Sequence, residues 1–178
     1  MTGWSGRYRN ARTDNVPDFE DGMGWLGGKQ PDDVGYGIVH GDFRMDNLVL
    51  DPADFSVQAL LDWELATLGD PLMDLGSAMA YWVQADDDEG MQMARRQPSN
   101  LPGMLTRNEF VQRYCSARDL PTGNWTYYEV FGLFRLAVIA QQIYFRFHHG
   151  QTTNPAFANF WMFTAYADHR CRSLAGLS

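Results

Sequence analysis

Apolar and polar positions follow two different periods along this chain, and the change between them predicts its elements. Three short apolar runs, over 36–39, 48–50 and 57–61, are bounded by polar turns and predict β-strands. Because the turn-rich segment 51–54 separates the second run from the third, these two strands are expected to pair as a hairpin. Elsewhere apolar residues recur every three or four positions, which is the period of a helix with one buried face.

Start and stop signals mark the helices. Asp70 and Pro71 form an N-cap followed by proline in the first helical position, and Thr106 forms a capping box with Glu109. Asn124 precedes the longest apolar stripe. The predicted helical segments are 1–13, 17–29, 71–83, 106–118, 124–149 and 154–174, with a loop over 86–103. The sequence therefore predicts a single domain over 1–178, α+β in class and predominantly helical.

Polar residues suited to metal binding gather around the predicted hairpin. Asp42 lies on the loop after the first strand, Asn47 begins the hairpin, and Asp62 ends it. The hairpin should therefore bring Asn47 and Asp62 together, with Asp42 close by. Oxygen ligands of this kind suit Mg²⁺, a hard cation that also binds phosphates.

Phosphoryl transfer needs this set of groups. A carboxylate orients the attacking hydroxyl and accepts its proton, while Mg²⁺ neutralises charge on the phosphates. The five-residue spacing from Asp42 to Asn47 matches the catalytic loop of kinases, and Asp62 follows on a strand as a metal-binding aspartate does there. Each residue taken alone could be a turn, a cap or a strand terminus, but their joint order and spacing favour the catalytic interpretation.

Three ordered motifs then identify a resemblance. His-Gly-Asp-x-x-x-x-Asn over 40–47, Leu-Leu-Asp-Trp-Glu over 60–64 and Gly-Asp-Pro-x-x-Asp-Leu over 69–75 resemble the aminoglycoside phosphotransferase and choline kinase superfamily, which is protein-kinase-like. The string over 61–71 is similar to the acyl-CoA-dehydrogenase-associated branch of that superfamily. The resemblance is strong over 1–82 and diffuse over the helical remainder.

The resemblance implies a role for each matching residue and an activity for the whole. Asp42 would be the catalytic base, and Asn47 and Asp62 would be the Mg²⁺ ligands. The supporting residues would be His40 in the loop, Asp74 as its anchor, Asp70 as a helix cap and Glu64 facing the metal or the substrate. The implied activity is transfer of the γ-phosphoryl group of ATP to a small-molecule hydroxyl.

The nucleotide-binding part of such an enzyme has no counterpart in the sequence. Lys29 is the only lysine and does not lie on a predicted strand. Gly22, Gly24, Gly27 and Gly28 do not form a Gly-x-Gly-x-x-Gly loop between strands, so no cofactor-binding residue for ATP can be assigned. The chain is therefore expected to be a protein-kinase-like C-terminal lobe whose small β-hairpin carries the catalytic loop, with the N-terminal nucleotide-binding lobe absent. Exposed apolar surface near the hairpin should then lead to a homo-oligomer or to binding of that lobe in trans.

Composition and charge limit the kinds of partner that this chain is expected to bind. The net charge of −8 argues against nucleic acid, and neither a signal peptide nor an uncharged run of membrane-spanning length is expected. Cys115 and Cys171 are isolated and predict reduced, buried thiols in a cytoplasmic protein. Residues 1–94 carry 5 Lys and Arg against 18 Asp and Glu, which favours a cationic acceptor, whereas the branch resemblance favours anionic hydroxyacyl thioesters.

Two other function classes stay open at this point. The first is a non-catalytic truncated remnant or binding module of the same family, which the missing nucleotide lobe would explain. The second is a metal-dependent hydrolase, which would need a denser set of ligands than His40, Asp42 and Asp62 supply.

Overall fold

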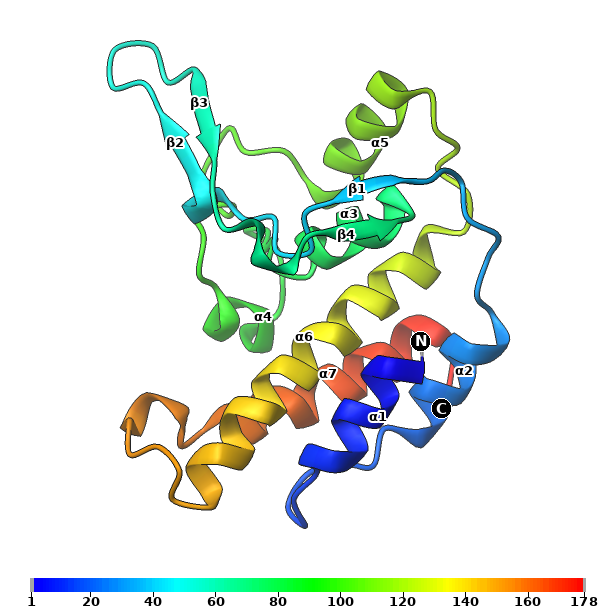
Figure 1. The fold of residues 1–178 in the computed structure, drawn as a ribbon, viewed down its shortest axis with the longest axis vertical. Coiled ribbons are helices and arrows are strands. Elements are labelled where there is room, and N and C mark those ends of the chain that lie inside the picture. The colour runs from blue at the N-terminus through cyan, green and yellow to red at the C-terminus, as the bar shows by residue number, and fades with distance from the viewer. Residues whose placement is uncertain (1, 178) are drawn as a thin grey trace.

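The computed structural model describes residues 2–177, and helices dominate it (Figure 1). The α-helices are α1 (Thr2–Ala11), α2 (Glu20–Gly28), α3 (Pro71–Met79), α4 (Glu89–Ala94), α5 (Arg107–Arg118), α6 (Trp125–His148) and α7 (Phe160–Ala175). The strands are β1 (Gly37–Val39), β2 (Leu48–Leu50), β3 (Val57–Leu60) and β4 (Thr67–Gly69). The 3-10 helices are η1 (Met45–Asn47), η2 (Trp63–Leu65) and η3 (Pro155–Phe157). The predicted α+β, predominantly helical class is confirmed.

The long helix α6 is the centre of the molecule. It crosses the molecule diagonally, with α1 and α7 on one side and α3 with the strands on the other (Figure 1). Buried residues occur on more than one face of α6, because α1, α3 and α7 all pack against it. By length and composition α6 could span a membrane, but most of it is buried inside the protein, as in a core helix.

Two glycines let α3 lie directly on α6. A Cβ atom placed on Gly132 would lie 2.0 Å from the carbonyl oxygen of Gly76, and one placed on Gly76 would lie 2.4 Å from the carbonyl oxygen of Tyr128. No side chain fits at such distances, so the two backbones are in contact at the crossing. The position of α3 on α6 is therefore fixed by backbone atoms and cannot adjust through side-chain rotation.

Two antiparallel strand pairs flank the segment that contains Asp42. Strands β2 and β3 form the predicted hairpin, which projects from the helices (Figure 1) and has an irregular register between Val49 and Leu50. Strand β1 pairs with β4, so that Ile38 lies opposite Leu68. The sequence did not predict β4, since three residues ending in glycine are too short to show a strand period.

Several predicted boundaries were wrong, each for a local reason. Helix α3 ends at Met79 and not at 83, because its last carbonyls are used by tight turns. The predicted loop over 86–103 contains α4, whose N-cap is Asp88. Asn124 precedes α6 without a side-chain capping bond, and Asn154 caps η3 and not α7. The predicted capping box at the start of α5 is confirmed.

The strand region exposes many large apolar side chains. Ile38 is 74% exposed and Leu68 is 56% exposed, although the two lie opposite each other on β1 and β4. The other exposed large apolar residues of this region are Tyr36, Val49, Leu50, Phe55, Val57, Leu61, Trp63 and Leu65. The sequence predicted apolar exposure near the hairpin, and the structure confirms it. We call this set together with Ile38 and Leu68 the apolar strand face.

Substituting Gly132 by alanine should destabilise the fold strongly. The new methyl group would overlap the backbone of α3, so we expect the free energy of unfolding to fall by about 3 kcal/mol. Chemical denaturation followed by circular dichroism measures this. Gly24→Ala in α2 is the matched control, because a Cβ atom there meets nothing within 4 Å and should raise stability by up to about 1 kcal/mol. Equal stability of the Gly132→Ala and wild-type proteins would show that the two helices do not touch through backbone.

Candidate active site

Asp74 on α3 holds the start of the loop that carries Asp42. Its Oδ2 accepts a hydrogen bond from the backbone N–H of His40 at 2.7 Å, and its Oδ1 accepts one from the N–H of Gly41 at 2.8 Å. A carboxylate that receives two successive N–H groups fixes both the position and the direction of the chain. The loop is thus anchored to α3 before it reaches Asp42.

Gly41 is required at its position for two reasons. Its φ angle is +80°, and a Cβ atom there would lie 2.6 Å from the carbonyl oxygen of Leu65. The carbonyl of Gly41 accepts a hydrogen bond from the guanidinium of Arg135 on α6. Both backbone polar groups of Gly41 are therefore bound, one by α3 and the other by α6.

His40 serves the loop with both ring nitrogens. Its Nε2 lies 2.7 Å from the carbonyl oxygen of Leu61, and its Nδ1 accepts a hydrogen bond from the N–H of Asp42 at 3.2 Å. These partners require the neutral tautomer with the proton on Nε2. The ring is 4% exposed and packs against Trp63 with 4.7 Å between ring centroids. Since neither nitrogen is available to a ligand, His40 is placed as a structural part of the loop.

Asn47 joins the Asp42 loop to the strand that ends at Asp62. Its side-chain amide Nδ2 donates to the carbonyl oxygen of Asp42 at 2.9 Å, and its own carbonyl oxygen accepts from the N–H of Leu61 at 2.8 Å. Asp62 is exposed and adopts a left-handed backbone conformation, with φ 70° and ψ 48°. The structure thus brings together Asp42, Asn47 and the residue next to Asp62.

Asp62 has a backbone conformation that is unusual for a residue other than glycine. A non-glycine residue in the left-handed region carries a conformational cost, and such residues concentrate at functional sites. Asp62 occupies the N-cap position of η2, yet its side chain makes no capping bond. Glu64 lies exposed on η2, and Asp70 caps α3 by accepting from the N–H of Leu72 at 2.8 Å. Asp62 therefore keeps its carboxylate free of any local structural task.

The polar set is chemically suited to Mg²⁺. Because Nδ2 of Asn47 is used within the loop, its Oδ1 is the amide atom able to ligate a metal, beside the carboxylate of Asp62. Within residues 2–177 no group of three or more His, Cys, Asp or Glu side chains is arranged to hold a metal. Mg²⁺ does not need one, since it usually takes one or two protein oxygens together with phosphates and water.

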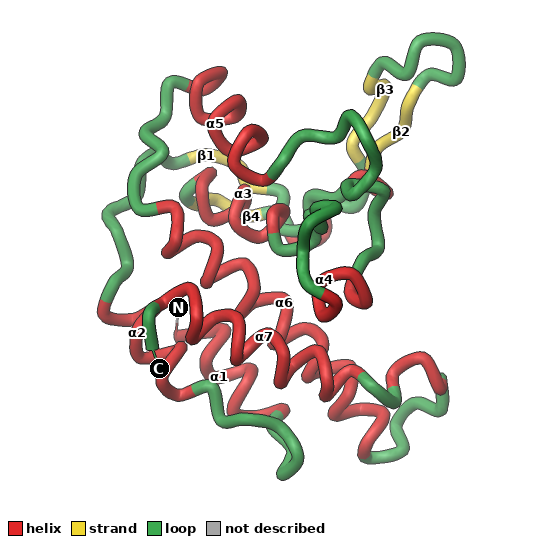
Figure 2. The backbone as a smooth tube through the Cα atoms, turned by 180° about the vertical axis from the view of Figure 1, so that it is seen from behind, coloured by secondary structure: helices red, strands yellow, loops and turns green. Residues whose placement is uncertain are grey.

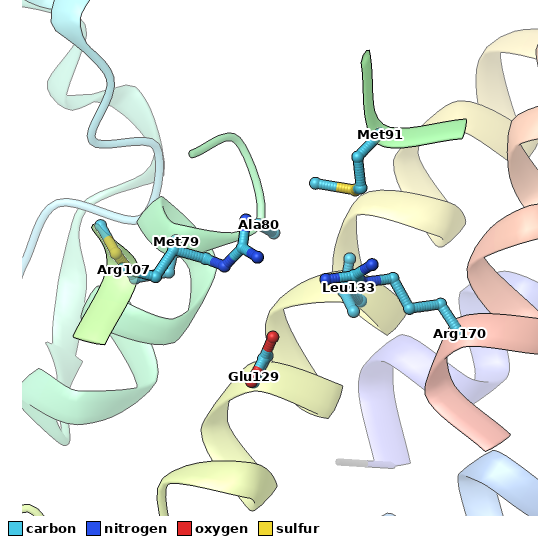
Figure 3. Close-up of a pocket in the computed structure, with 7 residues that line it drawn as sticks. All are labelled: Met79, Ala80, Met91, Arg107, Glu129, Leu133 and Arg170. Carbon is cyan, nitrogen blue, oxygen red and sulfur yellow. The ribbon is translucent and has the colours of Figure 1, made fainter. Parts of the chain in front are cut away.

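A small, partly open cavity lies elsewhere, lined by residues of α3, α4, α5, α6 and α7. It has a volume of about 10 Å³, enough for one water molecule. Figure 3 shows the guanidinium groups of Arg107 and Arg170 approaching it from opposite sides, with Glu129 below. Asp87 pairs with Arg107 at 2.6 Å, and this arrangement of charges is already balanced. The cavity is too small for a substrate and shares no residue with the Asp42 loop.

The chain is similar to known proteins in sequence and in structure. A family model described as "Phosphotransferase enzyme family" matches residues 1–115. The chain belongs to this family. The predicted resemblance to the aminoglycoside phosphotransferases is confirmed.

Relatives of this phosphotransferase family member are found in longer proteins. It is 37% identical over 153 residues to mouse acyl-CoA dehydrogenase family member 10, covering 85% of this chain and 14% of the relative. It is 33% identical over 156 residues to human acyl-CoA dehydrogenase family member 11, covering 85% and 20% respectively. A crystal structure from Ralstonia eutropha JMP134, described as a candidate aminoglycoside phosphotransferase, matches with a TM-score of 0.83 at 27% identity. That match covers 98% of this chain and 54% of the solved one.

Sequence reasoning missed the cation that holds the phosphotransferase loop from α6. Arg135 is 5% exposed, and its guanidinium also lies 5.0 Å from the ring centroid of Trp4. Burial lowers the pKa of Arg135, while the negative charges of Asp42 and Asp74 act in the opposite direction. The signal was present, because Arg135 is the only charged residue in the apolar segment 130–140.

Removing one acceptor oxygen from Asp74 should loosen the loop. Asp74→Asn replaces one carboxylate oxygen by an amide NH₂ that cannot accept the second backbone N–H, so we expect a loss of about 1–3 kcal/mol of stability. Amide hydrogen exchange at His40 and Gly41 should accelerate, which NMR measures directly. Asp32→Asn, an exposed carboxylate before β1, is the control and should change neither quantity. Unchanged exchange at both amides would contradict the anchoring role of Asp74.

Proposed function

We propose that this chain performs the transfer step of an ATP- and Mg²⁺-dependent phosphotransferase acting on the hydroxyl group of a small molecule. The observation that carries the proposal is the bonding of Asn47, which ties the Asp42 loop to the strand leading to Asp62. Family membership supports phosphotransfer as the class of reaction. ATP, Mg²⁺ and the small-molecule acceptor are the finer parts of the proposal.

In this proposal each residue does one task. Asp42 accepts the proton of the acceptor hydroxyl as its oxygen bonds to the γ-phosphorus, and the bond from the γ-phosphorus to the β–γ bridging oxygen breaks to release ADP. Asn47 and Asp62 would hold Mg²⁺, which when bound neutralises charge on the phosphates. His40 takes no part in proton transfer, because both of its ring nitrogens are occupied. Glu64 would face the metal or the substrate as a supporting residue.

The surface beside the loop bears on the charge of the acceptor. A shallow, open part of the surface, lined in part by Arg95, Arg96 and Gln97, borders the loop, since Gln97 accepts a hydrogen bond from the N–H of Met45 at 2.7 Å. Its two exposed arginines favour an acceptor that carries negative charge, as hydroxyacyl thioesters do, over a cationic acceptor.

The location and the partners are proposed on similar grounds. Cys115 and Cys171 are free and buried, which supports a cytoplasmic protein.

The apolar strand face supports docking of a second body, and we propose that this body is the nucleotide-binding lobe that ATP transfer requires. Its ten large apolar side chains lie on short strands and turns between Tyr36 and Leu68, before and after the Asp42 loop in the chain.

When the chain is isolated, the apolar strand face should lead to self-association. We expect light scattering to report an oligomer at micromolar concentration, because exposed apolar surface of this extent is unfavourable in water. Replacing Ile38 and Leu68 by lysine should restore a monomer, since the two side chains lie opposite each other. Met93→Lys is the control, because Met93 is equally exposed but lies on α4. A monomeric wild-type chain would contradict this expectation.

The catalytic assignment is tested by substituting Asp42. ADP release from MgATP, measured with the nucleotide-binding lobe supplied in trans and a panel of small-molecule hydroxyl acceptors, should fall about 10²–10⁴-fold in Asp42→Asn because the base is lost. Asp62→Asn should weaken Mg²⁺ binding in calorimetry, whereas Asp54→Asn, in the turn of the hairpin, should leave both measurements unchanged.

Two outcomes would count against the proposal in different ways. Full turnover in Asp42→Asn would show that another group is the base. Absence of any Mg²⁺-dependent turnover in a correctly folded wild-type chain, with the nucleotide-binding lobe bound to it, would favour the alternative of a non-catalytic binding module of the family.

A further inference from the structure

Tyr81 lies beside the Asp42 loop and had no role in the sequence interpretation. It follows α3 directly, and its N–H donates to the carbonyl oxygen of Ala78 at 3.2 Å in the turn that ends this helix. Helix α3 also carries Asp74, the anchor of the loop. One helix therefore delivers both the loop anchor and Tyr81.

A buried glutamine ties Tyr81 to the loop. Gln97 is 6% exposed, and its Oε1 accepts the N–H of Met45 while its Nε2 donates to the carbonyl oxygen of Tyr81 at 3.1 Å. Figure 2 shows how this is reached, since the loop between α4 and α5 passes the base of the β2–β3 hairpin. Both ends of the glutamine amide are used, so Tyr81 and the loop cannot move independently.

Arg44 closes the arrangement from the other side. Its guanidinium lies over the ring of Tyr81, 5.2 Å from the centroid, and its Nη2 pairs with Asp46 at 2.9 Å. Its Nε is 3.8 Å from Oδ2 of Asp42, and this Nε is buried without a hydrogen-bond partner among the described residues. A buried N–H without a partner is costly, which indicates that Arg44 is held for an interaction with the Asp42 carboxylate or with a group bound next to it.

Resting on the proposed function, we propose that Tyr81 is a positioning residue for Asp42. Its hydroxyl holds one carboxylate oxygen of the base, Arg44 braces its ring, and Gln97 fixes its backbone. The other carboxylate oxygen is then left to accept the proton of the substrate hydroxyl. A carboxylate that is already held in its reactive orientation loses little conformational entropy when the transition state forms. Positioning raises the rate by lowering this entropic cost.

The electrostatics of the phenol agree with this geometry. Burial raises the pKa of Tyr81, and the negative charge of Asp42 raises it further, while Arg135 and Arg44 act in the opposite direction. The phenol is protonated at neutral pH, as tyrosine ordinarily is, and can therefore donate a hydrogen bond to the carboxylate.

The first test needs only the chain itself. Titration of ¹³Cζ-labelled tyrosines by NMR, with Tyr81→Phe to assign the resonance, reports the pKa of Tyr81. Asp42→Asn should lower this pKa because a nearby negative charge is removed, and Arg44→Gln should raise it. Asp54→Asn, an exposed carboxylate in the turn of the β2–β3 hairpin, is the control and should leave the pKa unchanged. An unaltered Tyr81 titration in Asp42→Asn would overturn the proposal.

The second test separates positioning from mere packing. In MgATP turnover, Tyr81→Phe should lower kcat about tenfold without changing KM for ATP, as expected when only the transition state loses an interaction. Tyr166→Phe is the control, because it removes a tyrosine–aspartate bond of 2.7 Å to Asp88 far from the loop. Unchanged kcat in Tyr81→Phe would overturn the positioning role. A wild-type chain without turnover, but with coupled Tyr81 and Asp42, would overturn the proposed function and leave the contact standing.

Discussion

The backbone contact between Gly76 and Gly132 is the constraint on which the rest of the structure depends. It places α3 on α6 without an intervening side chain, so the two helices present their neighbouring residues at a fixed separation. Asp74 lies just before the contact on α3, and Arg135 lies just after it on α6. These two residues bind the N–H and the carbonyl of Gly41, one from each helix. The place of the Asp42 loop is therefore set by how closely two backbones can approach.

The loop itself is a small unit in which most polar groups have a structural partner. His40 uses both ring nitrogens, Asn47 uses its amide donor, and Gly41 uses both backbone groups. Two residues differ from these, because each carries a polar group without a hydrogen-bond partner among the described residues. Asp62 holds its carboxylate free on a left-handed backbone, and Arg44 holds a buried Nε without a partner. Reactive groups are thus carried on a framework whose other hydrogen bonds are already made.

Local signals were enough to predict much of the fold. Proline after Asp70, the capping box at Thr106 and the hairpin with its turn each depend on residues close in sequence, and each is present in the structure. The candidate residues from His40 to Asp74 could be named because they lie within one continuous motif. Strand β4 and helix α4 could not be predicted, because short elements show no period and depend on partners distant in sequence.

The same reason explains which site residues were missed. Tyr81, Gln97 and Arg135 reach the loop only through tertiary packing, and their contacts with Arg44, Met45 and Gly41 span 37 to 94 positions along the chain. No spacing rule connects a glutamine in an irregular loop with the N–H of Met45. Only Arg135 shows a signal in the sequence, as a single charge in an apolar helix. This pattern predicts a buried cation but does not predict which residue it binds.

Helix α3 holds three contact residues at fixed positions along and around its axis. This limits the insertions and deletions that the chain can tolerate there. Asp70, Asp74 and Gly76 each meet a different partner, namely the helix N-terminus, the loop and α6. Inserting or deleting one residue between them would rotate the following residues by about 100° and shift them by about 1.5 Å along the axis. All later contacts of the helix would then fall out of phase at once. The turn of the β2–β3 hairpin carries no such phase, so the chain can vary in length there and only in composition along α3.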